Sequence, residues 1–423
     1  MRFTKIALAG GTALTLSMTM AIADENKAFL DQQDAGNSAL ITQSGSFNQA
    51  GSSTDAMVQR GDTVDAGYNT LTILQSSDNN TLGLSNGGVD QRHRKNGPLD
   101  TSVRNPRNKA TLTQSGGGAN VIGGVSQYSN GGPGAASISN DLTVTQSGTA
   151  NTLVRVDQVG KPNDNNVATV TMSGTGSNID LIQQGVGNNN SGTNTLTIAM
   201  SGTGNGIGDF TVGGAAALSG ATAAHFVQSL STRTTANVII SGSGNLVGTQ
   251  QSGRTNTVGT LDVSGTNNQL GVLQNGDRNI MTVAAITGEA NNIGVSQLGN
   301  LNMASVTTTG NRNAFLVTQN GGSNEAMVTI NGNDNGQANP LTGVAGGLGL
   351  DSGIFAQFGT DNALTFNAMG NMNAFATKQD GSDNTINGSQ NGDSNQVAVL
   401  QVGSTNLASF SQSGNGNNAA ISQ

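Results

Sequence analysis

The chain has 423 residues, but its composition is not that of an ordinary globular protein. Only 34% of the residues are hydrophobic, 3% are aromatic and 10% are charged, with 62 glycines and no tryptophan. So little apolar material excludes one large core, although it can fill a narrow core repeated along a stack. The formal net charge of −8 argues against nucleic acid as a partner. The absence of cysteine excludes disulfides and thiolate metal sites.

Residues 1–23 have the pattern of a secretory signal peptide. Arg2 and Lys5 form a basic start, an apolar or small stretch follows, and Ala21-Ile22-Ala23 precedes Asp24. A retained membrane helix is less favoured because the apolar run is short and contains Gly and Thr. Residues 24–38 are polar and lie outside the repeat described next, and we expect them to form a flexible leader.

From residue 39 to residue 423 the chain repeats a hexad with Gly at its third position and Asn at its sixth. QLGNLN (297–302) and TTGNRN (308–313) are two consecutive copies. If the first hexad position is numbered 0, the Gly is at +2 and the Asn at +5. Between residues 240 and 335 copies begin every 11 or 12 residues, and position 0 alternates between Gln and an aliphatic residue or Thr. The full unit is therefore a pair of half-repeats, 22–23 residues long.

The residues between hexads alternate as a strand does. Positions +7 and +9 are apolar, as in Ile293 with Val295 and Phe315 with Val317, while the positions between them are smaller or more polar. The Gly at +2 permits a turn that other residues enter at a cost. We therefore predict an all-β fold, a β-solenoid of stacked strand–turn–strand repeats. The composition is also typical of disorder, but a disordered chain needs no such register.

Three stretches interrupt the repeat, at about 84–109, 206–237 and 336–352. The first holds most of the clustered basic residues, and a solvated loop is favoured there over a binding patch. The Ala-rich part of the second, 211–226, is compatible with a short helix or a loop.

The repeated Gln and Asn residues predict ladders of hydrogen-bonded side chains. A lone buried amide leaves donors unpaired at a cost of about 1–3 kcal/mol, whereas stacked amides satisfy one another at the strand spacing of about 4.8 Å. The predicted ladder residues are Gln251, Gln274, Gln297, Gln319, Gln357, Gln379, Gln390, Gln401, Gln412, Asn256, Asn279, Asn302, Asn324, Asn362, Asn384, Asn395, Asn406 and Asn417. The predicted turn glycines are Gly253, Gly276, Gly299, Gly321, Gly359, Gly381, Gly392, Gly403 and Gly414.

The last repeat carries no charged or proline-bearing cap, so its edge is expected to template another copy. The alternative is a monomeric solenoid binder, either an adhesin or an ice-binding rod, for which outward Thr307, Thr318 and Thr329 form a short run. A glycan hydrolase would need clustered carboxylates on one face, and the sequence does not predict them. His93 and His225 lie in different insertions. We therefore predict no enzyme, no metal site and no cofactor.

The segment QVGSTNLASFSQ (401–412) reads Q-x-G-x-x-N-x-A-x-x-x-Q, and QSGSFNQA (43–50) matches its first half. This pattern resembles the curlin repeat of curli subunits, the extracellular amyloid fibres of Gram-negative bacteria. The resemblance implies export through a dedicated outer-membrane channel and assembly with its own kind and other curlin-type subunits, for adhesion and biofilm matrix. The Ser that the family has six residues before the Gln is Asn here, at Asn395 and Asn406. The resemblance therefore leaves open whether the chain is a main subunit or a nucleator.

Overall fold

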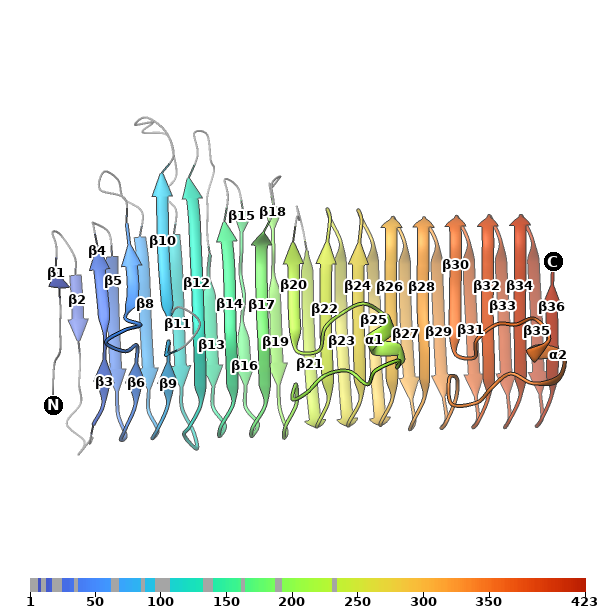
Figure 1. Cartoon of the computed structure of the whole chain (residues 1–423), viewed down its shortest axis with the longest axis horizontal. Coiled ribbons are helices and arrows are strands. Elements are labelled where there is room, and N and C mark those ends of the chain that lie inside the picture. Colours follow the sequence, from blue (N-terminus) through green and yellow to red (C-terminus); the bar gives the residue numbers. More distant parts are fainter. Residues whose placement is uncertain are drawn as a thin grey trace. The chain divides into compact units, whose positions relative to one another are not determined.

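The computed structural model describes residues 7–8, 13–16, 25–33, 37–61, 68–84, 88–95, 107–131, 140–160, 164–186, 192–229 and 234–423. The described chain is nearly all β, built from parallel strands in stacked sheets (Figure 1). This confirms the predicted all-β, solenoid-like fold. The chain divides into two compact units, residues 1–206 with 226–235 and residues 207–225 with 236–423, which are described in turn.

Each rung of the second unit contributes one strand to each of two parallel sheets, here called sheet A and sheet B. Sheet A contains β22 (Leu246–Ser252), β24 (Gln269–Asn275), β26 (Asn292–Asn300), β28 (Ala314–Gly322), β30 (Ile354–Thr360), β32 (Ala374–Ser382), β34 (Gln396–Ser404) and β36 (Asn418–Ser422). Sheet B contains β21 (Thr235–Ser243), β23 (Thr257–Thr266), β25 (Ile280–Glu289), β27 (Met303–Thr309), β29 (Glu325–Asn331), β31 (Ala363–Met369), β33 (Thr385–Asn391) and β35 (Leu407–Ser413).

The inner faces of the two sheets meet in a narrow apolar core. In β26 the inward residues Ile293 and Val295 are fully buried, as the alternation in the sequence predicted. Phe355 of sheet A and Phe366 of sheet B have ring centroids 5.0 Å apart, so side chains from the two sheets interdigitate. Each rung adds a few such side chains, and stacking supplies the burial that a single rung lacks.

The first unit repeats the same arrangement. Its sheet-A strands are β1 (Ala7–Leu8), β3 (Lys27–Ala28), β4 (Leu30–Gln33), β6 (Gln49–Ala50), β7 (Met57–Arg60), β9 (Thr81–Leu82), β10 (Val89–Lys95), β12 (Val121–Gly131), β14 (Thr152–Gly160), β17 (Asn178–Val186) and β20 (His225–Ser229). Its sheet-B strands are β2 (Ala13–Leu16), β5 (Asn37–Gln43), β8 (Tyr68–Gln75), β11 (Arg107–Gln114), β13 (Leu142–Gln146), β16 (Val170–Met172) and β19 (Leu196–Met200). The short strands β15 (Asp164–Asn165) and β18 (Gly192–Thr193) pair with each other.

Two stretches that the sequence placed outside the register contribute strands. The predicted flexible leader, 24–38, supplies β3, β4 and the start of β5, and its Gln32 is buried. The predicted break, 84–109, contains β10, which pairs with β7 and β12, and the start of β11. These strands lack the Gly and Asn of the hexad nearby, so motif counting missed them. Residues 85–87 and 96–106 of that break, and most of the predicted signal peptide, lie outside the described residues.

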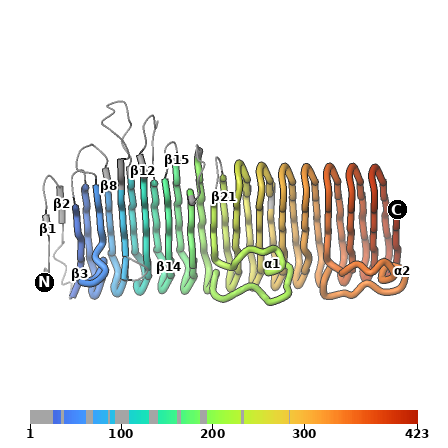
Figure 2. Tube along the Cα trace, turned by 45° about the horizontal axis from the view of Figure 1, so that its top comes forward, coloured from blue at the N-terminus to red at the C-terminus, as the bar shows by residue number. Residues whose placement is uncertain are grey.

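The other two interruptions lie in the second unit, wholly or in large part, and each contains a one-turn helix (Figure 2). The helix α1 (Ala215–Leu218) forms from the Ala-rich segment, and α2 (Gly343–Gly346) lies in the third interruption. α1 contacts β24, β26 and β28, whereas α2 contacts β34 and β36. Each inserted segment therefore lies across rungs that come later in the chain.

Candidate functional site: the amide ladders and the last rung

A continuous ladder of buried glutamines runs along one corner of the second unit. In each rung the Nε2 of the Gln donates to the Oε1 of the Gln in the next rung, over distances of 2.8–3.1 Å. The structure thus brings together seven of the predicted glutamines, and the ladder ends on one that was not predicted, Gln423. The predicted members are Gln251, Gln274, Gln297, Gln319, Gln357, Gln379 and Gln401.

The remaining two predicted glutamines form a separate pair at the opposite corner. Gln390 Nε2 donates to Gln412 Oε1 at 2.9 Å. The rung before them has Ala368 in register with Gln390, and earlier rungs have apolar residues or Thr at this corner, among them Ile330. The second unit therefore carries one complete Gln ladder and, at its last rungs, the beginning of another.

The asparagines form a side-chain ladder from Asn279 to Asn384 and also bind the backbone of neighbouring turns. Asn256 is typical: its Nδ2 donates to the carbonyl oxygen of Gly276 in the next rung, at 2.8 Å. Its Oδ1 accepts from the backbone N–H of Asn279, at 2.9 Å. Each such Asn therefore fastens two turns together. This column comprises the predicted Asn256, Asn279, Asn302, Asn324, Asn362, Asn384 and Asn406.

Asn395 and Asn417 belong to the opposite corner, in a column whose other members were not predicted as site residues. Asn417 N–H donates to Asn395 Oδ1 at 3.0 Å, and Asn395 N–H donates in turn to Asn373 Oδ1 at 2.9 Å. The hexad motif carried the signal for these residues, but position 0 of their hexads is mostly not Gln. The missed members are Asn245, Asn268, Asn291, Asn313, Asn335 and Asn373.

The turn glycines stack on one another along each corner. Gly276 has φ +123°, in the region that favours Gly, and a Cβ added to it would collide with the carbonyl oxygen of Gly299 in the next rung. One corner holds the predicted Gly253, Gly276, Gly299, Gly321, Gly359, Gly381 and Gly403, and the other holds Gly392 and Gly414. Only a residue without a side chain permits this approach of successive turns.

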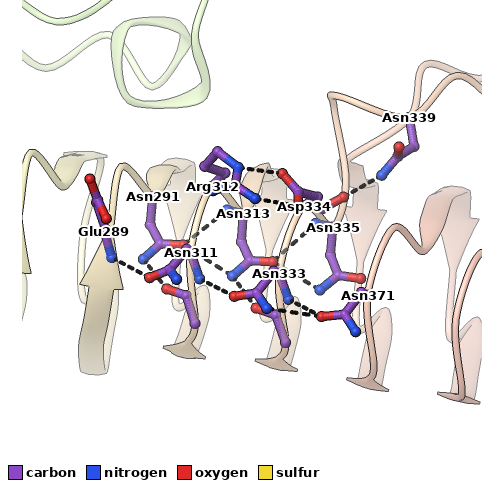
Figure 3. Close-up of polar contacts among 12 residues, drawn as sticks. Glu289, Asn291, Asn311, Arg312, Asn313, Asn333, Asp334, Asn335, Asn339 and Asn371 are labelled. Atoms are coloured by element: carbon purple, nitrogen blue, oxygen red, sulfur yellow. Dashed lines mark hydrogen bonds and ion pairs between the residues drawn. The ribbon is translucent and has the colours of Figure 1, made fainter.

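The sequence reading missed a third ladder, at hexad position +3 (Figure 3). Backbone N–H groups of Asn311 and Asn333 donate to the Oδ1 atoms of Asn333 and Asn371 in the following rungs, at 2.9 and 3.0 Å. The adjacent ion pair joins Arg312 Nη2 to Asp334 Oδ2 at 2.7 Å. This hydrogen bond lowers the pKa of Asp334 below its ordinary value and raises the pKa of Arg312. These contacts fix the register of neighbouring turns.

Two glutamine ladders run through the first unit, one at each corner. In sheet A, Gln donates to Gln from rung to rung at 2.7–2.9 Å. Its members are Gln32, Gln59, Gln91, Gln127, Gln158, Gln184 and Gln228. In sheet B the ladder comprises Gln43, Gln75, Gln114 and Gln146, and it ends where Gln146 meets the Sδ of Met172 at 3.7 Å.

In the last described rung of the second unit, β35 with β36, the ladder side chains pair with the preceding rung. A Cβ added at Gly403 or Gly414 would meet only the Asn of its own turn, whereas the same Cβ one rung earlier would strike a backbone carbonyl. Among the described strands, β36 pairs with β34 and β35 pairs with β33. Leu407 on this rung is an exposed apolar side chain.

The comparison with known families falls on these same rungs. Residues 392–423 match the family model described as the curlin associated repeat. The last rungs of the second unit are therefore similar to the curlin associated repeat. This confirms the resemblance inferred from the sequence for the segment that carries it most clearly. No curated protein is similar enough to the chain to count as a match.

Other kinds of site find little support among the residues that the structure describes. They contain no cluster of three or more His, Asp or Glu side chains placed to hold a metal ion. No helix in the described part of the chain is both long and apolar enough to cross a membrane. The predicted run of outward threonines is wrong, because Thr307 and Thr329 pair in sheet B, whereas Thr318 lies in sheet A.

Proposed function

We propose that the chain is a secreted structural subunit that assembles through its last rung into extracellular amyloid fibres. The observation that carries the proposal is the run of Gln and Asn ladders through the stacked rungs, which includes the segment that matches the curlin associated repeat. An exposed strand edge recruits another strand of compatible register.

The hydrogen-bond polarity of the ladders supports templating in one direction. Within the chain, each Gln donates its Nε2 forward to the next rung, as Gln401 does to Gln423. On the last rung Gln412 Nε2 donates to the backbone oxygen of Gln396 and keeps a second proton. An incoming rung with Gln Oε1 at this place continues the pattern, whereas an apolar residue there leaves that proton unpaired.

Adhesion and biofilm matrix are the roles proposed for these fibres outside a Gram-negative cell. Export in this proposal begins with the signal pattern of residues 1–23 and continues through an outer-membrane channel, with other curlin-type subunits as partners. Few charges and ladders of amides suit a structural polymer. The proposed role is thus that of a building block and not of an enzyme.

The test is assembly of the purified chain from Asp24 onward, followed by thioflavin-T fluorescence with and without preformed seeds. We expect a lag that seeds abolish, and fibre diffraction with reflections near about 4.8 and 10 Å. A matched chain with charged residues on the last rung, Gln412→Lys with Leu407→Lys, should assemble far more slowly.

A β-rich monomer that stays soluble for days, even with seeds, would contradict intrinsic self-assembly. The chain would then be a solenoid binder or a subunit that depends on a separate nucleator. Capture on preformed curlin-type fibres, against capture on surface glycans, separates these two outcomes.

A further inference from the structure

The two inserted segments of the second unit, strap 1 (residues 207–224) and strap 2 (residues 337–352), share one docking device. In strap 1, the Thr211 N–H donates to Gln269 Oε1 at 2.9 Å, and Gln269 Nε2 donates back to Thr211 Oγ1 at 2.8 Å. The Ala216 N–H of α1 donates to Asn292 Oδ1 at 2.7 Å. Strap 1 is thus held by an outward Gln and an outward Asn on neighbouring rungs.

Strap 2 repeats these contacts on later rungs. The N–H and the Oγ1 of Thr342 both donate to Gln396 Oε1, at 2.7 and 2.9 Å, and the Ala345 N–H of α2 donates to Asn418 Oδ1 at 2.8 Å. Gln396 and Asn418 are register partners in β34 and β36. Gln269 and Asn292 are related in the same way in β24 and β26.

The straps differ in what lies on the next rung. α1 also contacts β28, the rung beyond its docking pair. A Cβ built on Gly294 would touch both the carbonyl oxygen of Ala215 and the Cδ1 of Leu316, so Leu316 lies directly beside Ala215. Both side chains are covered: Ala215 is 0% exposed and Leu316 is 8% exposed.

The equivalent place beside α2 is uncovered. Val344 precedes the docking Ala345 as Ala215 precedes Ala216, and Val344 is 59% exposed. The docking strand β36 pairs with β34 alone among the described strands, so no described strand provides a counterpart of Leu316. α1 thus contacts its two docking strands and the next strand, β28, whereas α2 contacts its docking strands β34 and β36 and no further described strand.

We infer that the Val344 side of α2 is a docking surface for a second copy of this chain. The second copy packs its first rung against Val344. The inference rests on the proposed assembly through β35 and β36 and specifies the contact made there. The side chain that meets Val344 stands at hexad position +8 of sheet A, as Leu316 does. In the rung that contains β3, that position is Phe29, which is half-buried.

The test compares Val344→Asp with Leu218→Asp. Leu218, on α1, is 51% exposed and is the matched control because the rung beyond α1 belongs to the same chain. Both variants should fold, since neither side chain makes a docking hydrogen bond, and circular dichroism verifies this. Seeded elongation should slow roughly tenfold for Val344→Asp, as expected for an apolar interface anchor, and should be unchanged for Leu218→Asp.

A second variant measures the contact directly. The chain has no cysteine, so Val344→Cys with Phe29→Cys introduces two thiols only, and a short bismaleimide should join copies in assembled material. The pair Leu218→Cys with Phe29→Cys should give no such product.

Equal elongation of the two Asp variants, with no crosslink through position 344, would overturn the docking surface while leaving fibre assembly intact. If the parent chain does not elongate seeds and the Val344→Cys, Phe29→Cys chain gives no crosslink, both this inference and the proposed function are overturned.

Discussion

At the scale of single residues, each turn contains two hexad positions with positive φ, +2 and +4, which differ in the residues they accept. Position +2 is Gly because both the backbone angle and the approach of the next turn require it, as at Gly276. Position +4 also has a left-handed backbone but accepts Arg278 and Leu301, with φ of 59° and 62°. Such non-Gly residues are strained by about 1 kcal/mol or more, which the surrounding hydrogen bonds offset.

Gly276→Ala should therefore destabilise the turns more than its change in φ preference alone would. We expect a loss of about 2–3 kcal/mol, the upper part of the ordinary range for point mutations, seen as faster hydrogen exchange in β24 and β26. Gly349→Ala is the control, because Gly349 has φ +65° with open space around its Cβ direction. Equal effects of the two substitutions would show that close stacking of the turns contributes nothing.

At the scale of elements, the stability lost when Gln residues of a ladder are replaced should depend on how many ladder ends are left unpaired and not on how many residues are replaced. Gln297→Leu leaves the Nε2 of Gln274 and the Oε1 of Gln319 without their ladder partners, at about 1–3 kcal/mol for each buried group. Replacing Gln274, Gln297 and Gln319 together by Leu also leaves only two ladder ends without a partner, the Nε2 of Gln251 and the Oε1 of Gln357. Buried apolar residues at the opposite corner, such as Ile330, show that a column of apolar side chains packs there. The triple variant should therefore lose little more stability in denaturant unfolding than the single one; a threefold larger loss would refute the ladder account.

The same elements show how far the sequence could predict the fold. The repeat period, the alternation of inward and outward residues in the strands and the corner that holds the Gln ladder could all be predicted from residue spacing. Rungs of equal length place the same repeat position in register from one rung to the next. Gln91 was missed because its rung has no nearby hexad, although the residue is buried in the ladder. The docking of Ala345 on Asn418 spans 73 residues, and no local pattern encodes a contact of that kind.

At the scale of the whole molecule, glutamine is distributed unevenly between the two corners. The sheet-A corner carries the Gln ladder from Gln32 to Gln228 in the first unit and from Gln251 to Gln423 in the second. The sheet-B corner has Gln in the early rungs from Gln43 to Gln146 and again at Gln390 and Gln412, with Met172 and apolar residues or Thr between. The chain itself sets the register of internal rungs, whereas a rung that meets another molecule has only its own hydrogen bonds to define it. Gln thus occupies both corners at the last rungs, through Gln390 and Gln412, as well as in internal rungs such as that of Gln114.

Gln412→Ala should consequently slow seeded elongation more than Gln297→Ala does, although Gln297 is the more costly residue to remove from the monomer. Gln297 lies inside a complete ladder, whereas Gln412 Nε2 donates to the backbone oxygen of Gln396 and, in the proposed assembly, would give its second proton to an incoming rung. Gln43 is its counterpart, because its buried Oε1 has no hydrogen-bond partner among the described residues. We expect roughly tenfold slower elongation from either Gln412→Ala or Gln43→Ala, equivalent to the loss of about one hydrogen bond between uncharged groups.

If the two side chains meet between copies, the double variant should be no slower than either single one. Multiplied effects would show that they act at separate contacts, and normal elongation of Gln412→Ala would show that the second corner does not set intermolecular register.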